Sequence, residues 1–131
     1  YSAGYDFFAI KDYVIKPGEI IKIPTGYKAT FESDEMLLLV VRSSIGFKYN
    51  VRLTNQVGII ESDYYNNQDN EGHMWVCLQN HGDKDFILNK GDAYVQGIFV
   101  KFLTTIDDDV DTTRTGGIGS TNKKKEGSKN E

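Results

Sequence analysis

The sequence contains a single cysteine, Cys77, and this scarcity excludes an internal disulfide framework. No second Cys or His lies at zinc-finger spacing from it, and a lone cysteine of this kind favours a reducing, intracellular compartment. We therefore expect a cytoplasmic protein, with a phage or viral origin compatible, in which Cys77 is a small buried apolar residue.

Excess positive charge and long apolar runs are also lacking. Fifteen Lys and Arg against 19 Asp and Glu give a net charge of −4, whereas nucleic-acid binding needs a basic stripe that neutralises many phosphates. The longest apolar run, Met36 to Val41, has the length of a strand and not the roughly 20 residues of a membrane-spanning helix. We expect neither a nucleic acid nor a membrane as partner, so an anionic ligand must be bound by a local cluster.

The length of 131 residues fits one domain and favours oligomerisation as a source of further binding surface. The chain begins at Tyr1 and enters Ser2-Ala3-Gly4 at once, which indicates that an opening strand is missing. The predicted domain covers residues 1–104. Residues 105–131 are predicted to be an acidic linker, a flexible glycine-rich arm and a polar tail.

Short β-rich runs between turn signals predict an all-β fold of the sandwich, jelly-roll or barrel type. The turn signals are Lys16-Pro17-Gly18, Pro24-Thr25-Gly26, Asn80-His81-Gly82-Asp83 and Lys90-Gly91-Asp92. The expected strands are Asp6 to Ile10, Glu19 to Ile23, Tyr27 to Phe31, Met36 to Arg42, Gly58 to Glu61, His73 to Gln79, Phe86 to Leu88 and Tyr94 to Phe102. None of these runs shows convincing helical periodicity.

One motif, Arg42-Ser43-Ser44-Ile45-Gly46, ends an apolar strand with a guanidinium, two hydroxyls and a glycine. These groups supply the donors that a polyphosphate needs. The alternative is structural: Arg42 pairs with a carboxylate and the serines cap a helical turn that begins near Ile45. The motif by itself favours neither interpretation.

A second motif, Asn55 to Tyr64, places an amide, a glycine, the Glu61 carboxylate and an aromatic ring along one stretch that is predicted to form a hairpin. It could bind a base and position water, or be an edge hairpin with a solvated Glu61 and a half-packed Tyr64. Three further segments are weak when taken singly: Ala3 to Ala9, Lys90 to Gln96, and the glycine-rich Arg114 to Thr121.

Together these five segments resemble the five motifs of the trimeric dUTPase family, in the same order and over Ala3 to Thr121. The resemblance implies a β jelly-roll (β-clip barrel) subunit with a flexible C-terminal arm. It implies a homotrimer whose three active sites lie between subunits and hydrolyse dUTP to dUMP and pyrophosphate. In that family water attacks the α-phosphorus while Mg²⁺ is held mainly by the triphosphate.

The resemblance also implies roles for single residues. Glu61 would be the general base, Tyr64 would pack on the deoxyribose and exclude a 2′-hydroxyl, and Asp6 would contact Mg²⁺ through water. The other implied substrate contacts fall into three groups: Arg42, Ser43, Ser44 and Gln96 on the phosphates; Asn55, Ile60 and Trp75 at the uracil edge; and Arg114, Gly117, Gly119 and Ser120 in the closing arm. For Trp75, burial in a strand core is the stronger expectation.

Three departures from the family pattern bear on function. Glu61 stands where the family has aspartate, and a displacement of about 1 Å can cost about 10²-fold in rate. The segment Tyr65 to Glu71 is an insertion beside the site, and its asparagines predict a solvated turn. Ile118 replaces the usual stacking phenylalanine, so His73 or Trp75 could supply a ring.

Two alternatives stay open at this point. A dCTP deaminase-like enzyme shares the fold and the Arg-Ser-Ser stretch, but Asn55-Gln56-Val57-Gly58 matches the uracil-binding segment instead. The second alternative is a regulatory module that binds dUTP, has weakened catalytic activity and acts on a protein partner. Glu61 and the insertion motivate it. A purely structural jelly-roll subunit is the least specific expectation.

Overall fold

The structure is a computed structural model that describes residues 1–106, and nine short strands dominate it. The strands are β1 (Tyr5–Phe8), β2 (Tyr13–Ile15), β3 (Ile20–Pro24), β4 (Glu35–Val41), β5 (Val51–Leu53), β6 (Gly58–Glu61), β7 (Trp75–Asn80), β8 (Phe86–Leu88) and β9 (Ala93–Lys101). One α-helix, α1 (Ser43–Tyr49), and one 3₁₀ turn, η1 (Ser62–Tyr64), complete the described part. The prediction of an all-β fold is confirmed.

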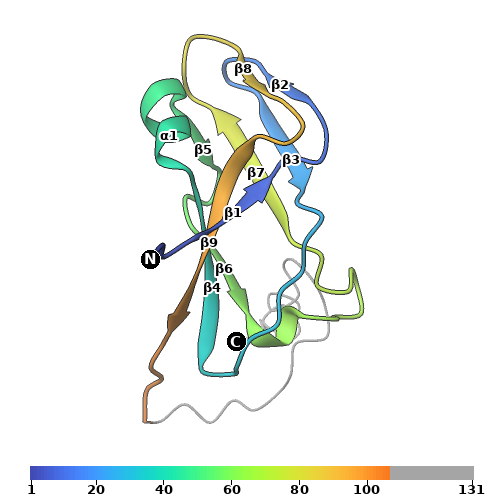
Figure 1. The fold of residues 1–131 in the computed structure, drawn as a ribbon, viewed down its shortest axis with the longest axis vertical. Helices are drawn as coiled ribbons and strands as arrows, with labels where there is room; N and C mark the ends of the chain where they lie inside the picture. The colour runs from blue at the N-terminus through green and yellow to red at the C-terminus, as the bar shows by residue number, and fades with distance from the viewer. Residues whose placement is uncertain (107–131) are drawn as a thin grey trace, which may run out of the picture.

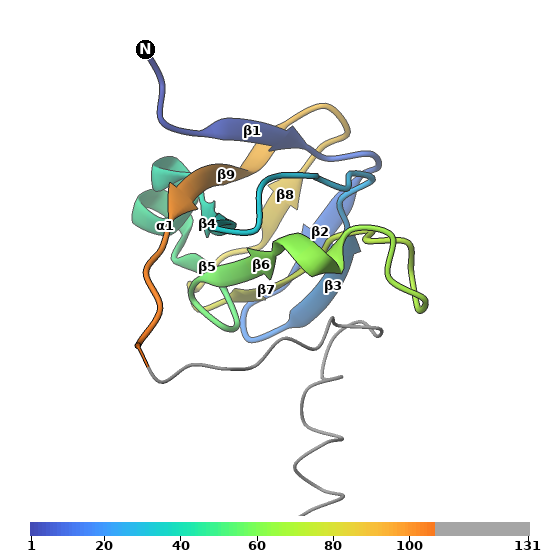
Figure 2. The ribbon, with the colours of Figure 1, turned by 90° about the horizontal axis from the view of Figure 1, so that it is seen from below.

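The strands form three antiparallel sheets, ordered β1-β9-β4-β6, β3-β7-β5 and β2-β8. The β2-β8 pair lies at one end of the elongated molecule and η1 lies at the other (Figure 1). In the view turned by 90°, β1, β9 and β4 lie on one side and β3 and β7 on the other (Figure 2). The larger sheets therefore form two layers.

Alternating side chains from these sheets fill the core between them. Ile15, Ile23, Val51, Leu78 and Val95 are fully buried. In β2, β5 and β8 the outer two residues of each triplet are buried and the middle one is exposed, which is the period-two pattern of a strand with one wet face. Burial of this alternating set stabilises the two-layer arrangement.

Seven of the eight predicted strands are confirmed within two residues at each end. The strand predicted over Tyr27 to Phe31 is wrong, because that segment crosses between layers without ladder pairing in the described chain. The hairpin predicted over Asn55 to Tyr64 is also wrong. The strands on either side of its turn, β5 and β6, pair with β7 and β4 in different sheets.

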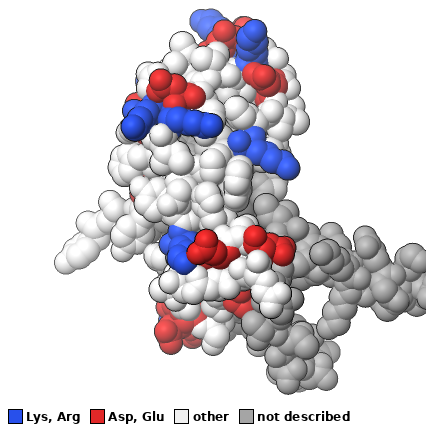
Figure 3. Space-filling view, turned by 90° about the vertical axis from the view of Figure 1, so that its right-hand side faces the viewer, with Lys and Arg blue, Asp and Glu red and all other residues white. Residues whose placement is uncertain are grey.

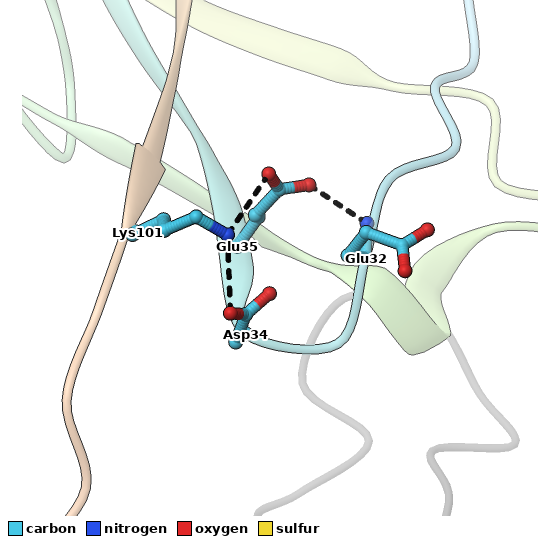
Figure 4. Close-up of polar contacts among 4 residues, drawn as sticks. All are labelled: Glu32, Asp34, Glu35 and Lys101. Atoms are coloured by element: carbon cyan, nitrogen blue, oxygen red, sulfur yellow. Dashed lines mark hydrogen bonds and ion pairs between the residues drawn. The ribbon is translucent and has the colours of Figure 1, made fainter.

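The C-terminal end of β9 is held to the start of β4 by a charged contact. Lys101 donates from Nζ to Asp34 Oδ2 at 3.1 Å and to Glu35 Oε2 at 3.4 Å, and the other Glu35 oxygen accepts from the Glu32 backbone N–H (Figure 4). The hydrogen bond that Lys101 donates to Asp34 raises the pKa of Lys101. This contact fixes the point from which the chain continues toward its C-terminal arm.

On the face drawn in Figure 3, Lys and Arg side chains alternate with Asp and Glu and form no continuous basic stripe among the described residues. Over residues 1–106 the helices are too short to cross a bilayer. The division predicted after residue 104 stays a prediction.

Candidate functional site

Three neighbouring strands bring Asp6, Gln96 and the end of β4 into one row. Asp6 on β1 pairs with Gln96 on β9, which pairs in turn with Val40 on β4. Arg42 follows β4 and places Nε 3.5 Å from Asp6 Oδ1. We call Asp6, Arg42, Ser43, Ser44 and Gln96 the strand-end cluster.

Gly4 makes room for the Gln96 side chain in this cluster. A Cβ atom built on Gly4 would lie 2.5 Å from Gln96 Oε1, closer than side-chain atoms can approach. Gly4, in the first motif, therefore leaves the space that the side chain of Gln96, in the fourth motif, occupies, although 92 positions in the sequence separate them. Sequence alone gave no indication of this contact.

The helix α1 displays the two serines of the strand-end cluster. It begins at Ser43, with Arg42 as N-cap and no capping side chain, and Ile45 anchors it in the core. Ser43 and Ser44 are exposed. One part of the structural alternative is confirmed, because Arg42 does pair with a carboxylate. The other part is wrong, because the helix begins at Ser43 and no serine side chain caps it.

A pocket of about 510 Å³ opens between β6 and the β3-β7-β5 sheet. It brings together all five pocket residues that the sequence predicted, namely Asn55, Ile60, Glu61, Tyr64 and Trp75. The volume lies in the range of small-ligand sites, and most of the lining is apolar with a few polar groups, as such sites usually are. The arrangement suits a flat heterocycle with a sugar attached.

Two of the polar lining residues that the sequence did not predict are Lys22 and Cys77. Lys22 on β3 and Cys77 on β7 are register partners, so both reach the pocket through strand pairing and not through a local motif. Cys77 is half-buried at this wall, which corrects the expectation of a buried core residue. No motif-level signal could have found either one.

Trp75 is 41% exposed at the pocket rim, and the expectation that it is a core residue is therefore wrong. It is the first residue of β7, opposite Pro24, and its ring lies 5.5 Å from the His73 ring. The burial pattern of β7 alternates, with the next residue Val76 buried, so the Trp75 side chain lies on the less buried face of this central strand.

Tyr64 and Glu61 differ sharply in exposure. Tyr64 is 7% exposed, and Glu61 is on the surface side of the pocket. Glu61 ends β6 opposite Met36 at the start of β4. A fixed aromatic wall and an accessible carboxylate at the end of one strand can orient a substrate and a water molecule.

Most of the insertion Tyr65 to Glu71 is exposed, as expected for a solvated turn, but the turn is internally bonded around one buried amide. Asn67 is 6% exposed and donates to the Tyr64 carbonyl at 2.7 Å. Its Oδ1 accepts from the backbone N–H groups of Asp69 and Asn70. The loop, at the lower right of Figure 1 before β7, is organised around the buried Asn67 amide and the half-buried Asn70 amide.

The Glu61 end of the pocket and the strand-end cluster lie at opposite ends of β4, although the pocket lining reaches Leu39 in the middle of this strand. Met36, opposite Glu61, and Arg42 are separated along this strand by roughly 20 Å at the usual rise per residue. Asp6, Arg42 and Gln96 do not line the pocket. One copy of the described chain therefore does not bring the two groups together, and Arg114, Gly117, Gly119 and Ser120 lie outside the described residues.

Comparison with known proteins gives a consistent family. A family model for dUTPase matches residues 1–127. The deoxyuridine 5′-triphosphate nucleotidohydrolase of Lactococcus lactis is 46% identical over 123 residues, which cover 92% of this chain and 82% of the relative. That of Pseudomonas fluorescens is 34% identical over 131 residues, with 94% and 83% covered.

Solved structures agree with these relatives. The crystal structure of the dUTPase from Streptococcus mutans is similar with a TM-score of 0.73 and 39% identity, covering 86% of this chain and 84% of that one. A dUTPase mutant from phage phi11 of S. aureus, with a structural Mg(II) ion, has a TM-score of 0.69 and covers 86% of each chain. At 19% identity, this second likeness supports the fold alone.

Proposed function

Because the chain belongs to the dUTPase family and is a jelly-roll enzyme that hydrolyses dUTP to dUMP and pyrophosphate, we propose that the pocket between β6 and β7 binds the deoxyuridine. The observation that carries the proposal is the convergence of Asn55, Glu61, Tyr64 and Trp75 on one cavity. The predicted family is confirmed, and the dCTP deaminase alternative loses its support because the matched relatives are dUTP hydrolases.

The pocket divides into a base end and a sugar end. Asn55 offers an amide, and the backbone at Ile60 and Trp75 offers N–H and C=O groups, which together complement the edge of uracil. Trp75, exposed at the rim, offers the aromatic face that Ile118 cannot provide. The buried Tyr64 ring packs on the deoxyribose and rejects a ribose by steric clash.

Glu61 holds the attacking water and accepts its proton as the water attacks the α-phosphorus. Pyrophosphate leaves with the electron pair of the broken P–O bond, so no covalent enzyme intermediate is needed. The position of Glu61 at the end of β6, beside the rigid wall formed by Tyr64, orients its carboxylate. The longer glutamate side chain shifts this carboxylate relative to an aspartate by about 1 Å.

The strand-end cluster binds the triphosphate. Arg42 supplies a guanidinium, Ser43 and Ser44 supply hydroxyls, and Gln96 supplies an amide near the α-phosphate. The dUTPase family uses Mg²⁺, yet no group of three His, Cys, Asp or Glu able to hold a metal occurs within residues 1–106. A single half-exposed carboxylate, Asp6, fits an ion whose other ligands are phosphate oxygens and water, and bound Mg²⁺ neutralises phosphate charge.

A second and a third copy of the chain complete each site. Glu61 and Arg42 are separated by roughly 20 Å along β4, and no residue of the strand-end cluster lines the pocket, so the pocket of one subunit is paired with the strand-end cluster of another. A homotrimer, as in the family pattern, provides this by three-fold rotation. Arg114, Gly117, Gly119 and Ser120 would close over the phosphates, with Arg114 at the γ-phosphate. A cytoplasmic location and a regulatory protein partner stay predictions.

The experiment is pyrophosphate release from dUTP, with UTP, dCTP and dTTP as controls, with and without Mg²⁺. Glu61→Ala is expected to lower the rate by about 10²- to 10⁴-fold because the general base is lost. Glu61→Asp is expected to be slower than the wild type, since the shorter side chain retracts the carboxylate by about 1 Å.

Asp63→Asn is the matched control, because it neutralises a carboxylate two residues away that does not line the pocket. An unchanged rate in Glu61→Ala would refute the assignment of the base. Tight binding of dUTP without hydrolysis by the wild type would instead favour the regulatory binding module.

A further inference from the structure

We propose that Asn70, in the loop of residues 65–72, is a positioning residue that fixes the Tyr64 ring and thereby sets the discrimination between deoxyribose and ribose. The inference rests on the proposed function of the pocket, because it concerns the wall against which the sugar would pack. It assigns to the insertion a role in substrate selection that none of the five motifs contains.

The Tyr64 hydroxyl is held from two sides. It accepts a hydrogen bond from Asn70 Nδ2 at 2.9 Å and donates to the His73 carbonyl at 3.3 Å. The His73 backbone N–H in turn donates to the Asn70 carbonyl at 2.9 Å. One residue therefore contacts the hydroxyl directly and also orients the carbonyl that receives its proton.

The orientation of the Asn70 amide is determined by its other partners. Its Oδ1 accepts from Asn67 Nδ2 at 2.8 Å and from the Gly72 N–H at 3.1 Å. Two donors at the oxygen leave the NH₂ group to face the Tyr64 hydroxyl. A side chain without both an acceptor and a donor cannot make these contacts at once.

The opposite end of Tyr64 is held by the same loop. Asn67 donates to the Tyr64 carbonyl from its side chain at 2.7 Å and from its backbone at 3.2 Å. Tyr64 is thus held at its backbone and at the tip of its ring, which leaves the ring little freedom to turn.

The loop carries strain that only a firmly held segment retains. Asn66 and Glu71 adopt left-handed backbone conformations at φ 56° and 62°, which are unfavourable for residues with a side chain. A Cβ on Gly72 would lie 2.9 Å from backbone atoms of Tyr65 and Asn66. On the outer side, Lys28 Nζ donates to Asn66 Oδ1 at 2.7 Å and anchors the loop to the neighbouring segment.

Steric exclusion of a hydroxyl works only when the wall cannot move aside. A ribose adds one oxygen, and a loosely held ring would turn to accommodate it, whereas a ring fixed at both ends cannot. Asn70 therefore acts through Tyr64 and need not touch the substrate. Its loss should admit UTP more than it slows dUTP.

The test measures kcat/KM for dUTP and for UTP in the full-length protein. Asn70→Ala is expected to lower the dUTP-to-UTP ratio of kcat/KM about five- to tenfold, the equivalent of one hydrogen bond. Tyr64→Phe breaks the same link from its other end and should lower the ratio similarly. Gln68→Ala, an exposed amide in the same loop, is the matched control and should leave the ratio unchanged.

A double-mutant cycle separates positioning from general damage. In the Tyr64→Phe background, Asn70→Ala should change the ratio much less than in the wild type, because its partner is already gone. An equal drop in both backgrounds, or parallel losses for dUTP and UTP, would overturn the inference. If Asn70→Ala does not fold, an unchanged ratio in Tyr64→Phe overturns it equally.

Different results would contradict the proposed function and the proposed role of Asn70. If Tyr64→Leu relaxes the discrimination but Asn70→Ala and Tyr64→Phe do not, the sugar wall is correct and the role of Asn70 is wrong. If Tyr64→Leu leaves both substrates unaffected, the assignment of Tyr64 to the sugar fails, and the inference fails with it.

Discussion

Three tyrosines of this chain are buried, and they differ in whether the hydroxyl has a partner. Tyr64 has two hydrogen bonds, as described above. Tyr13 and Tyr94 have buried hydroxyls without a partner in the described part of the chain. Burial raises the pKa of Tyr13 and Tyr94, so both stay protonated. An unsatisfied buried hydroxyl is a source of instability.

Tyr94→Phe is therefore expected to stabilise the protein by about 1 kcal/mol, because it removes the hydroxyl and keeps the ring. Tyr64→Phe should destabilise by a similar amount, about 1 kcal/mol, since it leaves Asn70 without its acceptor. Thermal midpoints at one protein concentration would measure both. A lower midpoint for Tyr94→Phe would contradict the expectation and reveal a partner such as buried water.

The residues of the pocket show what a sequence can and cannot predict. Glu61 and Tyr64 were identifiable because they lie in one continuous motif, and the structure places them in one cavity. Lys22 and Cys77 enter through the register of β3 and β7, which no local pattern encodes. The role of the insertion was missed because asparagine is typical both of solvated turns and of buried amide networks.

At the scale of elements, apolar runs and turn signals decided which predictions were correct. The apolar run gave β4, and turn signals on both sides gave β8 although it has three residues, whereas β2 and β5, also of three residues, were missed because so few residues show no clear alternation. The helix α1 was anticipated only as an alternative, a turn near Ile45, because Ile45 is its only buried residue and no helical periodicity arises. The crossing segment Tyr27 to Phe31 has strand-like composition, but tertiary context overrides it.

Replacing two glycines by alanine tests the packing of these elements, because one replacement should lower the free energy of unfolding and the other should raise it. In β9, a Cβ on Gly97 would lie 3.0 Å from Leu37 and 3.2 Å from Phe7, so Gly97→Ala should destabilise by about 1–3 kcal/mol through overpacking. In α1, a Cβ on Gly46 would lie 3.9 Å from Val41, and Gly46→Ala should stabilise by up to about 1 kcal/mol. Urea unfolding of each variant measures the change in its free energy of unfolding relative to the wild type. Changes in the same direction for both variants would refute the packing argument.

At the scale of the whole molecule, the separation of Glu61 from the strand-end cluster supports the proposal that the active site is completed by the assembly. The resemblance implied sites between subunits, built from motifs of different chains. One described copy agrees with this, because it keeps Glu61 and Arg42 at opposite ends of β4.

Complementation between two inactive variants tests this arrangement. Glu61→Gln and Arg42→Ala should each be inactive alone, whereas trimers refolded from an equal mixture should regain roughly a quarter of the wild-type sites, because intact halves meet by chance. Pyrophosphate release from dUTP is the readout, with each variant refolded alone as the control. No recovery in verified mixed trimers would place both halves of the site in one chain.

The contact of Lys101 with Asp34 and Glu35 has a consequence for how the arm finds its site. Thirteen residues separate Lys101 from Arg114, and an extended chain spans at most about 3.5 Å per residue, so Arg114 always lies within about 45 Å of this anchor. Under the proposed function, its encounter with a bound triphosphate takes place within one assembly and is governed by an effective local concentration that does not fall when the protein is diluted. The proposed trimer then has one arm for every site.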